Sequence, residues 1–116
     1  MNIFIGKRGS GKTAELIKKS AEEKIYILTA TKRRVREILE VAKRLNLVIP
    51  HPITVDEYLS NDTYRGPVVK RGGILIDDAD HVLQYIFNGV YIDGITLTDQ
   101  HNIRYLEERR ILNEKD

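Results

Sequence analysis

Short apolar runs alternate with an amphipathic stretch at the start of the chain. Residues 2–5 and 25–28 are apolar and β-prone, and the first of these runs ends at Gly6. Between them, Ala14, Ile17 and Ala21 recur at helical spacing. This pattern predicts two buried strands joined by a helix that begins near residue 11.

The clearest helical pattern covers residues 32–45. Thr31 is placed to cap the start of this helix. Asn46 is expected to end it, and Pro50 and Pro52 prevent it from continuing. The apolar positions follow the spacing of one helix face, and they are Val35, Ile38, Leu39, Ala42 and Leu45.

The stretch from residue 47 to residue 72 carries weaker signals. Residues 53–55 are consistent with a short strand, residues 56–59 with a helical turn, and residues 61–67 with a loop. Residues 74–76 then form a third buried strand that ends in two aspartates. Helical spacing returns after it at Ala79, Val82, Leu83 and Ile86.

The end of the chain leaves two interpretations open. Asn88-Gly89 predicts the end of the preceding helix. Residues 90–98 are strand-like but contain Asp93-Gly94, so they form either a small hairpin or a strand of residues 95–98 alone. We expect residues 99–114 to form a polar helix. Its thin apolar stripe consists of Ile103, Leu106 and Ile111.

The alternation of strands and helices predicts one α/β domain over residues 1–116. Short strands that are apolar on both faces are typical of a mainly parallel sheet covered by helices, which makes a three-layer sandwich. A chain of 116 residues leaves no room for a second domain. With only four strands predicted, the sheet has an exposed edge, so we expect a homo-oligomer or a partner protein.

Composition narrows the class of protein. Hydrophobic residues make up 41% of the chain and charged residues 31%, which excludes a disordered chain, collagen and a coiled coil. The absence of cysteine excludes disulfides, thiolate zinc sites and cysteine nucleophiles. The sequence has neither a membrane-spanning apolar run nor a signal-peptide pattern, so we expect a cytoplasmic protein with no membrane partner.

Charge is distributed unevenly along the chain. Residues 1–50 contain 12 Lys and Arg against 5 Asp and Glu, whereas residues 51–116 contain 7 against 12. The basic half favours a polyanion as partner. A phosphate-binding lysine and solvated helix faces would account for the same excess.

The sequence Gly-Lys-Arg-Gly-Ser-Gly-Lys-Thr matches the phosphate-loop pattern G-x-x-x-x-G-K-[ST] at each fixed position. A predicted strand precedes it and a predicted helix follows it. Glycine lets the backbone wrap around phosphate oxygens, and the N–H groups of the loop and of the helix N-terminus point at the anion. The expected phosphate-binding residues are Gly6, Lys7, Arg8, Gly9, Ser10, Gly11, Lys12 and Thr13.

On these residues the chain resembles the P-loop NTPases, and residues 6–13 are similar to their Walker A motif. The resemblance is strong over residues 2–28 and fair over residues 73–80. It implies ATP and Mg²⁺ as cofactors, with Lys12 at the β- and γ-phosphates and the Thr13 hydroxyl on the metal.

Residues 74–78, Ile-Leu-Ile-Asp-Asp, resemble the Walker B strand of the same family. The resemblance implies that Asp77 holds Mg²⁺. Asp78 stands where the additional-strand, catalytic-glutamate division carries the glutamate that polarises the attacking water, so fast hydrolysis is in doubt while nucleotide binding is not. Asp80 is a spare carboxylate. Asp78 or Asp80 could instead cap the helix that follows.

The same division implies a strand order of 1-4-3-2. In that order the strand after Walker B lies between the two motif-bearing strands, and a polar residue at its tip senses the γ-phosphate. Thr98 fits this role, although it would also serve as a strand residue or as the cap of the next helix.

Residues 29–36 are similar to a segment that touches a nucleic-acid backbone in helicases and viral packaging ATPases. The residues that would contact DNA or RNA are Thr29, Thr31, Lys32, Arg33, Arg34 and Arg36. A solvated helix face is the equal alternative. An arginine finger could come from Arg104, Arg109 or Arg110.

The resemblance therefore implies a small Mg²⁺- and ATP-dependent ATPase in DNA or RNA processing, of a compact kind often encoded by phages. ATP is favoured over GTP because no Asn-Lys-x-Asp guanine motif is present. A kinase for a small molecule or nucleotide is one alternative. A nucleotide-responsive binding module with negligible hydrolysis is the other.

Overall fold

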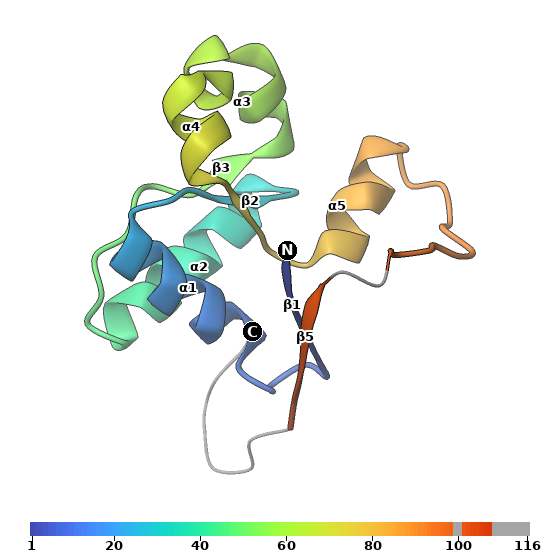
Figure 1. Ribbon diagram of the computed structural model, residues 1–116, viewed down its shortest axis with the longest axis horizontal. Coiled ribbons are helices and arrows are strands. Elements are labelled where there is room, and N and C mark those ends of the chain that lie inside the picture. Colours follow the sequence, from blue (N-terminus) through green and yellow to red (C-terminus); the bar gives the residue numbers. More distant parts are fainter. Residues whose placement is uncertain (99–100, 108–116) are drawn as a thin grey trace.

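A computed structural model describes residues 1–98 and 101–107, which form an α/β domain with short parallel sheets. Strands and helices alternate along most of the chain (Figure 1). The elements are β1 Asn2–Gly6, α1 Lys12–Glu23, β2 Ile27–Thr29, α2 Lys32–Arg44, β3 Ile53–Thr54, α3 Val55–Ser60, the 3₁₀ helix η1 Asp62–Arg65, α4 Pro67–Gly72, β4 Leu75–Ile76, α5 Ala79–Ile86 and β5 Asn102–Leu106.

The strands of the described residues form two separate sheets. In the first sheet β2 lies between β3 and β4 and is parallel to both, with Leu28 opposite Ile53 on one side and Ile76 on the other. In the second sheet β1 pairs in parallel with β5, with Ile3 opposite Ile103. The strands before and after α5, which are β4 and β5, therefore belong to different sheets.

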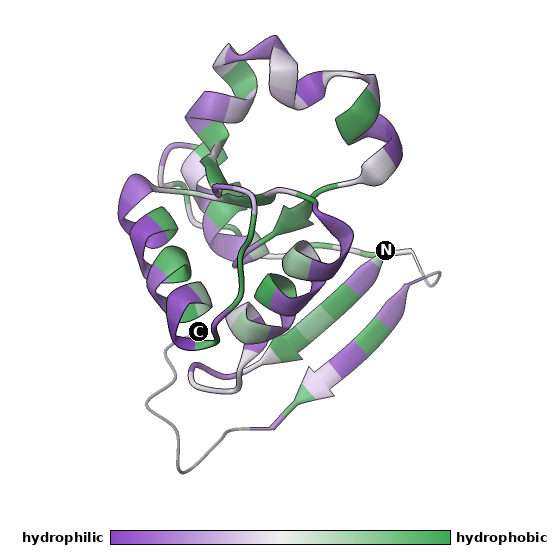
Figure 2. Cartoon of the chain, turned by 90° about the vertical axis from the view of Figure 1, so that its left-hand side faces the viewer, coloured by the Kyte–Doolittle hydropathy of each residue, from purple (hydrophilic) through white to green (hydrophobic). Residues whose placement is uncertain are grey.

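β2 is buried on both of its faces. Because side chains alternate along a strand, Ile27 and Leu28 point in opposite directions. Ile27 packs with Ile17 of α1 and Ile38 of α2, whereas Leu28 packs in a second cluster with Val82 of α5. Accordingly α1 and α2 lie together on one side of the strands and α5 lies on the other (Figure 1). Hydrophobic residues are concentrated in the central strands, and the helices carry both hydrophobic and hydrophilic residues (Figure 2).

The first two predicted helices are confirmed. α1 follows directly after residue 11, and α2 ends at Arg44. The Thr31 hydroxyl accepts a hydrogen bond from the Arg34 amide at 3.2 Å, which is the predicted cap of α2. The predicted helical turn at residues 56–59 is confirmed within α3, and the helix predicted from residue 79 is α5.

The predicted strand order 1-4-3-2 is not matched. β1 pairs with β5 and β2 with β4, but no described strand joins β4 to β5. Residues 90–98 form no strand, and Thr98 is exposed in irregular chain. The Asp93-Gly94 pair interrupts this segment, and β1 takes Asn102–Leu106 as its partner instead.

Two further expectations are corrected. The helix predicted over residues 99–114 is wrong where the chain is described, because Asn102–Leu106 is a strand, while residues 99–100 and 108–116 lie outside the described residues. The loop predicted over residues 61–67 contains η1, and its last residue, Pro67, begins the helix α4. Pro67 stands in the first turn of α4, where its fixed φ and missing N–H favour helix initiation.

None of the helices within residues 1–98 and 101–107 is both long and apolar enough to cross a membrane.

Candidate nucleotide and metal site

The loop between β1 and α1 bends back on itself at two glycines. Gly9 and Gly11 have φ values of 84° and 89°, a region that L side chains rarely adopt. The Ser10 amide donates to the Lys7 carbonyl at 3.0 Å, and the Lys12 ammonium donates to the same oxygen at 3.1 Å. The loop thus has the positive φ values that its glycine spacing predicts. The Lys12 ammonium folds back onto the loop at the Lys7 carbonyl.

Ser10 packs tightly against the end of β1. It is buried, and its hydroxyl has no hydrogen-bond partner within the described residues. A Cβ at Gly6 would collide with this hydroxyl, so only glycine fits there. A buried polar atom without a partner is costly in a folded protein, and a ligand in the loop is one way to satisfy it.

Thr13 and Asp77 meet although 64 residues separate them in the sequence. The Thr13 hydroxyl donates to Asp77 Oδ1 at 3.2 Å, and both residues are almost fully buried. Thr29, at the end of β2, donates to Asp77 Oδ2 at 3.3 Å. The start of α1 and the ends of β2 and β4 therefore converge on one carboxylate, as expected where parallel strands end at the same edge of a sheet.

Arg34 completes this cluster, and the sequence did not predict it there. Its Nε donates to Asp77 Oδ2 at 2.8 Å, and its Nη2 donates to the Thr13 hydroxyl at 2.5 Å and to Asp77 Oδ1 at 3.3 Å. The arginine side chain is only 14% exposed. Arg34 lies in the first turn of α2, which starts at the same edge of the sheet. That position is the sequence signal that could have predicted its place in the cluster.

The charge of Arg34 balances that of Asp77. Burial alone lowers the pKa of the Arg34 guanidinium, but the hydrogen bond to Asp77 and its negative charge more than offset this and leave the pKa above its usual value. A carboxylate as buried as Asp77 needs such a partner, because an unpaired buried charge is costly.

Asp78 and Asp80 form a second acidic pair beside this cluster. The hydrogen bond with Asp80, then burial, then the charges of Asp80 and Asp77 raise the pKa of Asp78 to about 6. The same hydrogen bond lowers the pKa of Asp80. Asp78 has a φ of 55° and makes no side-chain cap hydrogen bond to α5, so it is not held there as a helix cap.

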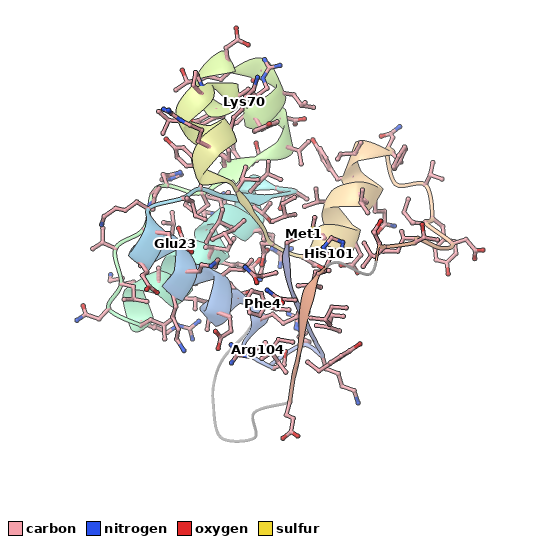
Figure 3. All side chains as sticks on the ribbon, viewed as in Figure 1. Met1, Phe4, Glu23, Lys70, His101 and Arg104 are labelled. Atoms are coloured by element: carbon pink, nitrogen blue, oxygen red, sulfur yellow. The ribbon has the colours of Figure 1, made fainter. Side chains whose placement is uncertain are left out.

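The other predicted site residues are spread more widely. Thr31 caps α2, while Lys32, Arg33 and Arg36 are exposed around the N-terminus of the same helix. Arg104 lies on β5 within 3.3 Å of Glu15, with its guanidinium 5.9 Å from the Phe4 ring centre, and thus ties β5 to α1 and β1 (Figure 3). Arg109 and Arg110 lie outside the described residues.

Thr98 is not brought to the end of a strand. It lies in irregular, exposed chain, so the position that the sensor role requires is not formed. The hydroxyl that does reach the cluster from a strand end is that of Thr29 on β2.

The donors at the cluster suit a magnesium ion bound through a substrate. Mg²⁺ prefers oxygen ligands and usually takes one or two carboxylates together with phosphate oxygens and waters. Thr13 and Asp77 supply a hydroxyl and a carboxylate at the mouth of the glycine loop. Among the described residues no group of three or more His, Asp or Glu is placed to hold a metal by itself.

Two hollows lie beside the cluster rather than in it. They have volumes of about 550 and 460 Å³, and both are lined by Asp56 and Tyr85. The Tyr85 hydroxyl donates to Asp56 at 2.6 Å between them. The smaller hollow is also lined by Thr31 and Lys32, so it adjoins the exposed basic end of α2.

No family model, no curated protein and no solved structure matches the chain.

Proposed function

We propose that this protein is a P-loop NTPase that binds Mg²⁺ and ATP at the glycine loop and hydrolyses the nucleotide. The observation that carries the proposal is the contact between Thr13 and Asp77 at 3.2 Å. Thr13 belongs to the segment that resembles Walker A and Asp77 to the segment that resembles Walker B, and the two lie 64 residues apart in the sequence.

The loop would hold the triphosphate. The φ values of Gly9 and Gly11 and the start of α1 supply backbone N–H groups and the positive end of a helix dipole. The ammonium of Lys12 would leave the Lys7 carbonyl for the β- and γ-phosphates. The unsatisfied Ser10 hydroxyl supports a ligand at this loop.

Thr13 and Asp77 would hold the metal. When bound, Mg²⁺ would neutralise charge on the phosphates. Asp78 would accept a proton from the attacking water. The water oxygen would bond to the γ-phosphorus while the bond from that phosphorus to the β–γ bridging oxygen breaks. With a pKa of about 6, Asp78 is mainly ionised at pH 7 and can act as this acceptor.

The exposed basic residues at the start of α2 support a nucleic acid as partner. Lys32, Arg33 and Arg36 surround a helix N-terminus at the edge of the sheet where the nucleotide would sit. A phosphate backbone bound there would lie close enough to the nucleotide site for each to influence the other.

The test is ATP binding and hydrolysis with and without single- and double-stranded DNA. We expect Lys12→Ala to weaken binding of a fluorescent ATP analogue and to lower turnover by about 100-fold, because a charge-assisted phosphate contact is lost. Lys18→Ala is the matched control, because it removes an exposed lysine from the same helix.

The outcomes separate the candidate functions. Turnover that depends on Lys12 and rises with DNA supports the nucleic-acid ATPase. Binding that depends on Lys12 without turnover supports the nucleotide-responsive binding module, and transfer of phosphate to an added small molecule supports a kinase. If the wild-type protein binds no nucleotide, the proposal is wrong.

A further inference from the structure

The guanidinium of Arg34 lies on the two side chains that would bind the metal. It reaches the Thr13 hydroxyl at 2.5 Å and both oxygens of Asp77 at 2.8 and 3.3 Å. A magnesium ion binds its oxygen ligands at about 2.1 Å. A guanidinium and a divalent cation cannot both take these oxygens at such distances, because their positive charges would repel each other at close range.

The backbone of Arg34 is fixed, but its side chain can adopt a second position near another carboxylate. The Arg34 amide is held by the Thr31 cap at 3.2 Å, so the residue stays in the first turn of α2. Glu37, one turn further along the helix, already lies 3.6 Å from Nη1 and is partly exposed. The guanidinium can therefore leave Asp77 by side-chain rotation and keep a carboxylate as its partner.

We propose that Arg34 competes with the divalent cation for Thr13 and Asp77, so that metal binding and release of the guanidinium are one event. Arg34 then determines the metal affinity of the site. In the metal-free protein it neutralises a buried carboxylate that would otherwise be unpaired. This inference rests on the proposed function, because it takes Thr13 and Asp77 as the metal ligands.

The test measures binding of Mn²⁺ by electron paramagnetic resonance, first alone and then with a non-hydrolysable ATP analogue, to wild-type protein, Arg34→Gln and Arg33→Gln. Both variants lose one positive charge, but the Arg33 side chain is 85% exposed and its ion pair is with Glu37 rather than with Asp77. We expect Arg34→Gln to bind Mn²⁺ about tenfold more tightly than wild type and Arg33→Gln to stay within about twofold, a difference typical of coupled binding events. Equal Mn²⁺ affinity in wild type and Arg34→Gln under both conditions, or no Mn²⁺ binding by either protein under both conditions, overturns the competition.

A second measurement uses the wild-type protein, because Arg34→Gln leaves Asp77 without its partner and could fail to fold. The ¹⁵N resonance of the Arg34 side-chain Nε–H reports its hydrogen bond to Asp77. We expect this resonance to shift and its proton to exchange faster with solvent as Mg²⁺ and ATP are added. A resonance that stays unchanged at saturation overturns the inference.

The two proposals fail in different ways. Wild-type protein that binds no ATP ends the proposed function, yet the Mn²⁺ comparison still decides whether Arg34 competes with the cation. If the protein binds ATP but wild type and Arg34→Gln have equal Mn²⁺ affinities, the proposed competition by Arg34 is wrong and the proposed function still stands.

Discussion

At the scale of single residues, the cluster around Asp77 joins parts of the chain that the sequence keeps far apart. Its carboxylate accepts hydrogen bonds from Thr13, Thr29 and Arg34. The two hydroxyls supply oxygen atoms and the arginine supplies the balancing charge. A buried carboxylate with several donors is well held, and this is the condition for a precise metal ligand.

The neighbouring acidic residue leads to a prediction about pH. The pKa of Asp78 rises from 3.8 to about 6 on folding, so between these values the folded protein binds more protons than the unfolded chain. The contribution of Asp78 to stability therefore grows as the pH falls through about 6. Above that pH, ionised Asp78 loses its hydrogen bond with Asp80, and its burial and the repulsion from Asp80 and Asp77 also oppose folding.

We therefore expect Asp78→Asn to be more stable than wild type at pH 7.5, by about 1 kcal/mol once solvent screening of this half-exposed side chain is allowed for. The difference is expected to shrink at pH 5, where Asp78 is mostly protonated. Urea denaturation at both pH values measures it. A stability difference that is the same at both pH values would contradict the cause given for the pKa shift.

At the scale of elements, the cap of α2 has two roles. The Thr31 hydroxyl accepts from the Arg34 amide at 3.2 Å and so satisfies one of the free N–H groups at the helix start. The same hydrogen bond fixes the backbone of Arg34, whose side chain reaches Asp77. An interaction predicted from local sequence thus also positions the site.

We expect Thr31→Ala to lower the free energy of unfolding by about 1 kcal/mol, the usual cost of a lost N-cap. Thr31→Ser keeps the hydroxyl and is the matched control, expected to lie near wild type. Urea denaturation monitored by circular dichroism measures both. Equal losses in the two variants would show that the methyl group, rather than the cap, is responsible.

At the scale of the whole molecule, the two sheets differ in burial. All residues of β2 are buried between the helices on its two faces, whereas most of β5 is exposed. β5 is held by its pairing with β1 and by Arg104, which contacts Glu15 and Phe4. Local opening is easiest where few buried apolar contacts are lost.

We therefore expect amide hydrogens of β5 to exchange with solvent at least about 100-fold faster than those of β2, because β5 can open without unfolding the core. Hydrogen exchange followed by nuclear magnetic resonance gives both rates in one sample. Comparable protection of β5 and β2 would mean that both sheets open only in global unfolding.

The sequence by itself determined the local features. The 3.6-residue spacing of apolar positions defined α1, α2 and α5, the hydroxyl before α2 defined its cap, and the glycine spacing defined a loop with φ values near 85° at Gly9 and Gly11. Each of these depends on interactions between residues a few positions apart, so the local pattern is sufficient. Pro67 in the first turn of α4 is likewise a local signal for helix initiation.

Only the tertiary structure decided which strands pair and which side chains meet. Residues 90–98 and 102–106 both carry strand-forming residues, and the segment that joined the fold was the one that could lie along the free edge of β1. In the same way, Arg34 looks like its exposed neighbour Arg33 in the sequence, and only the convergence of β2, β4 and α2 gives it Asp77 as a partner. Pairing of distant segments depends on the surfaces that the rest of the fold leaves open, and no local pattern contains that information.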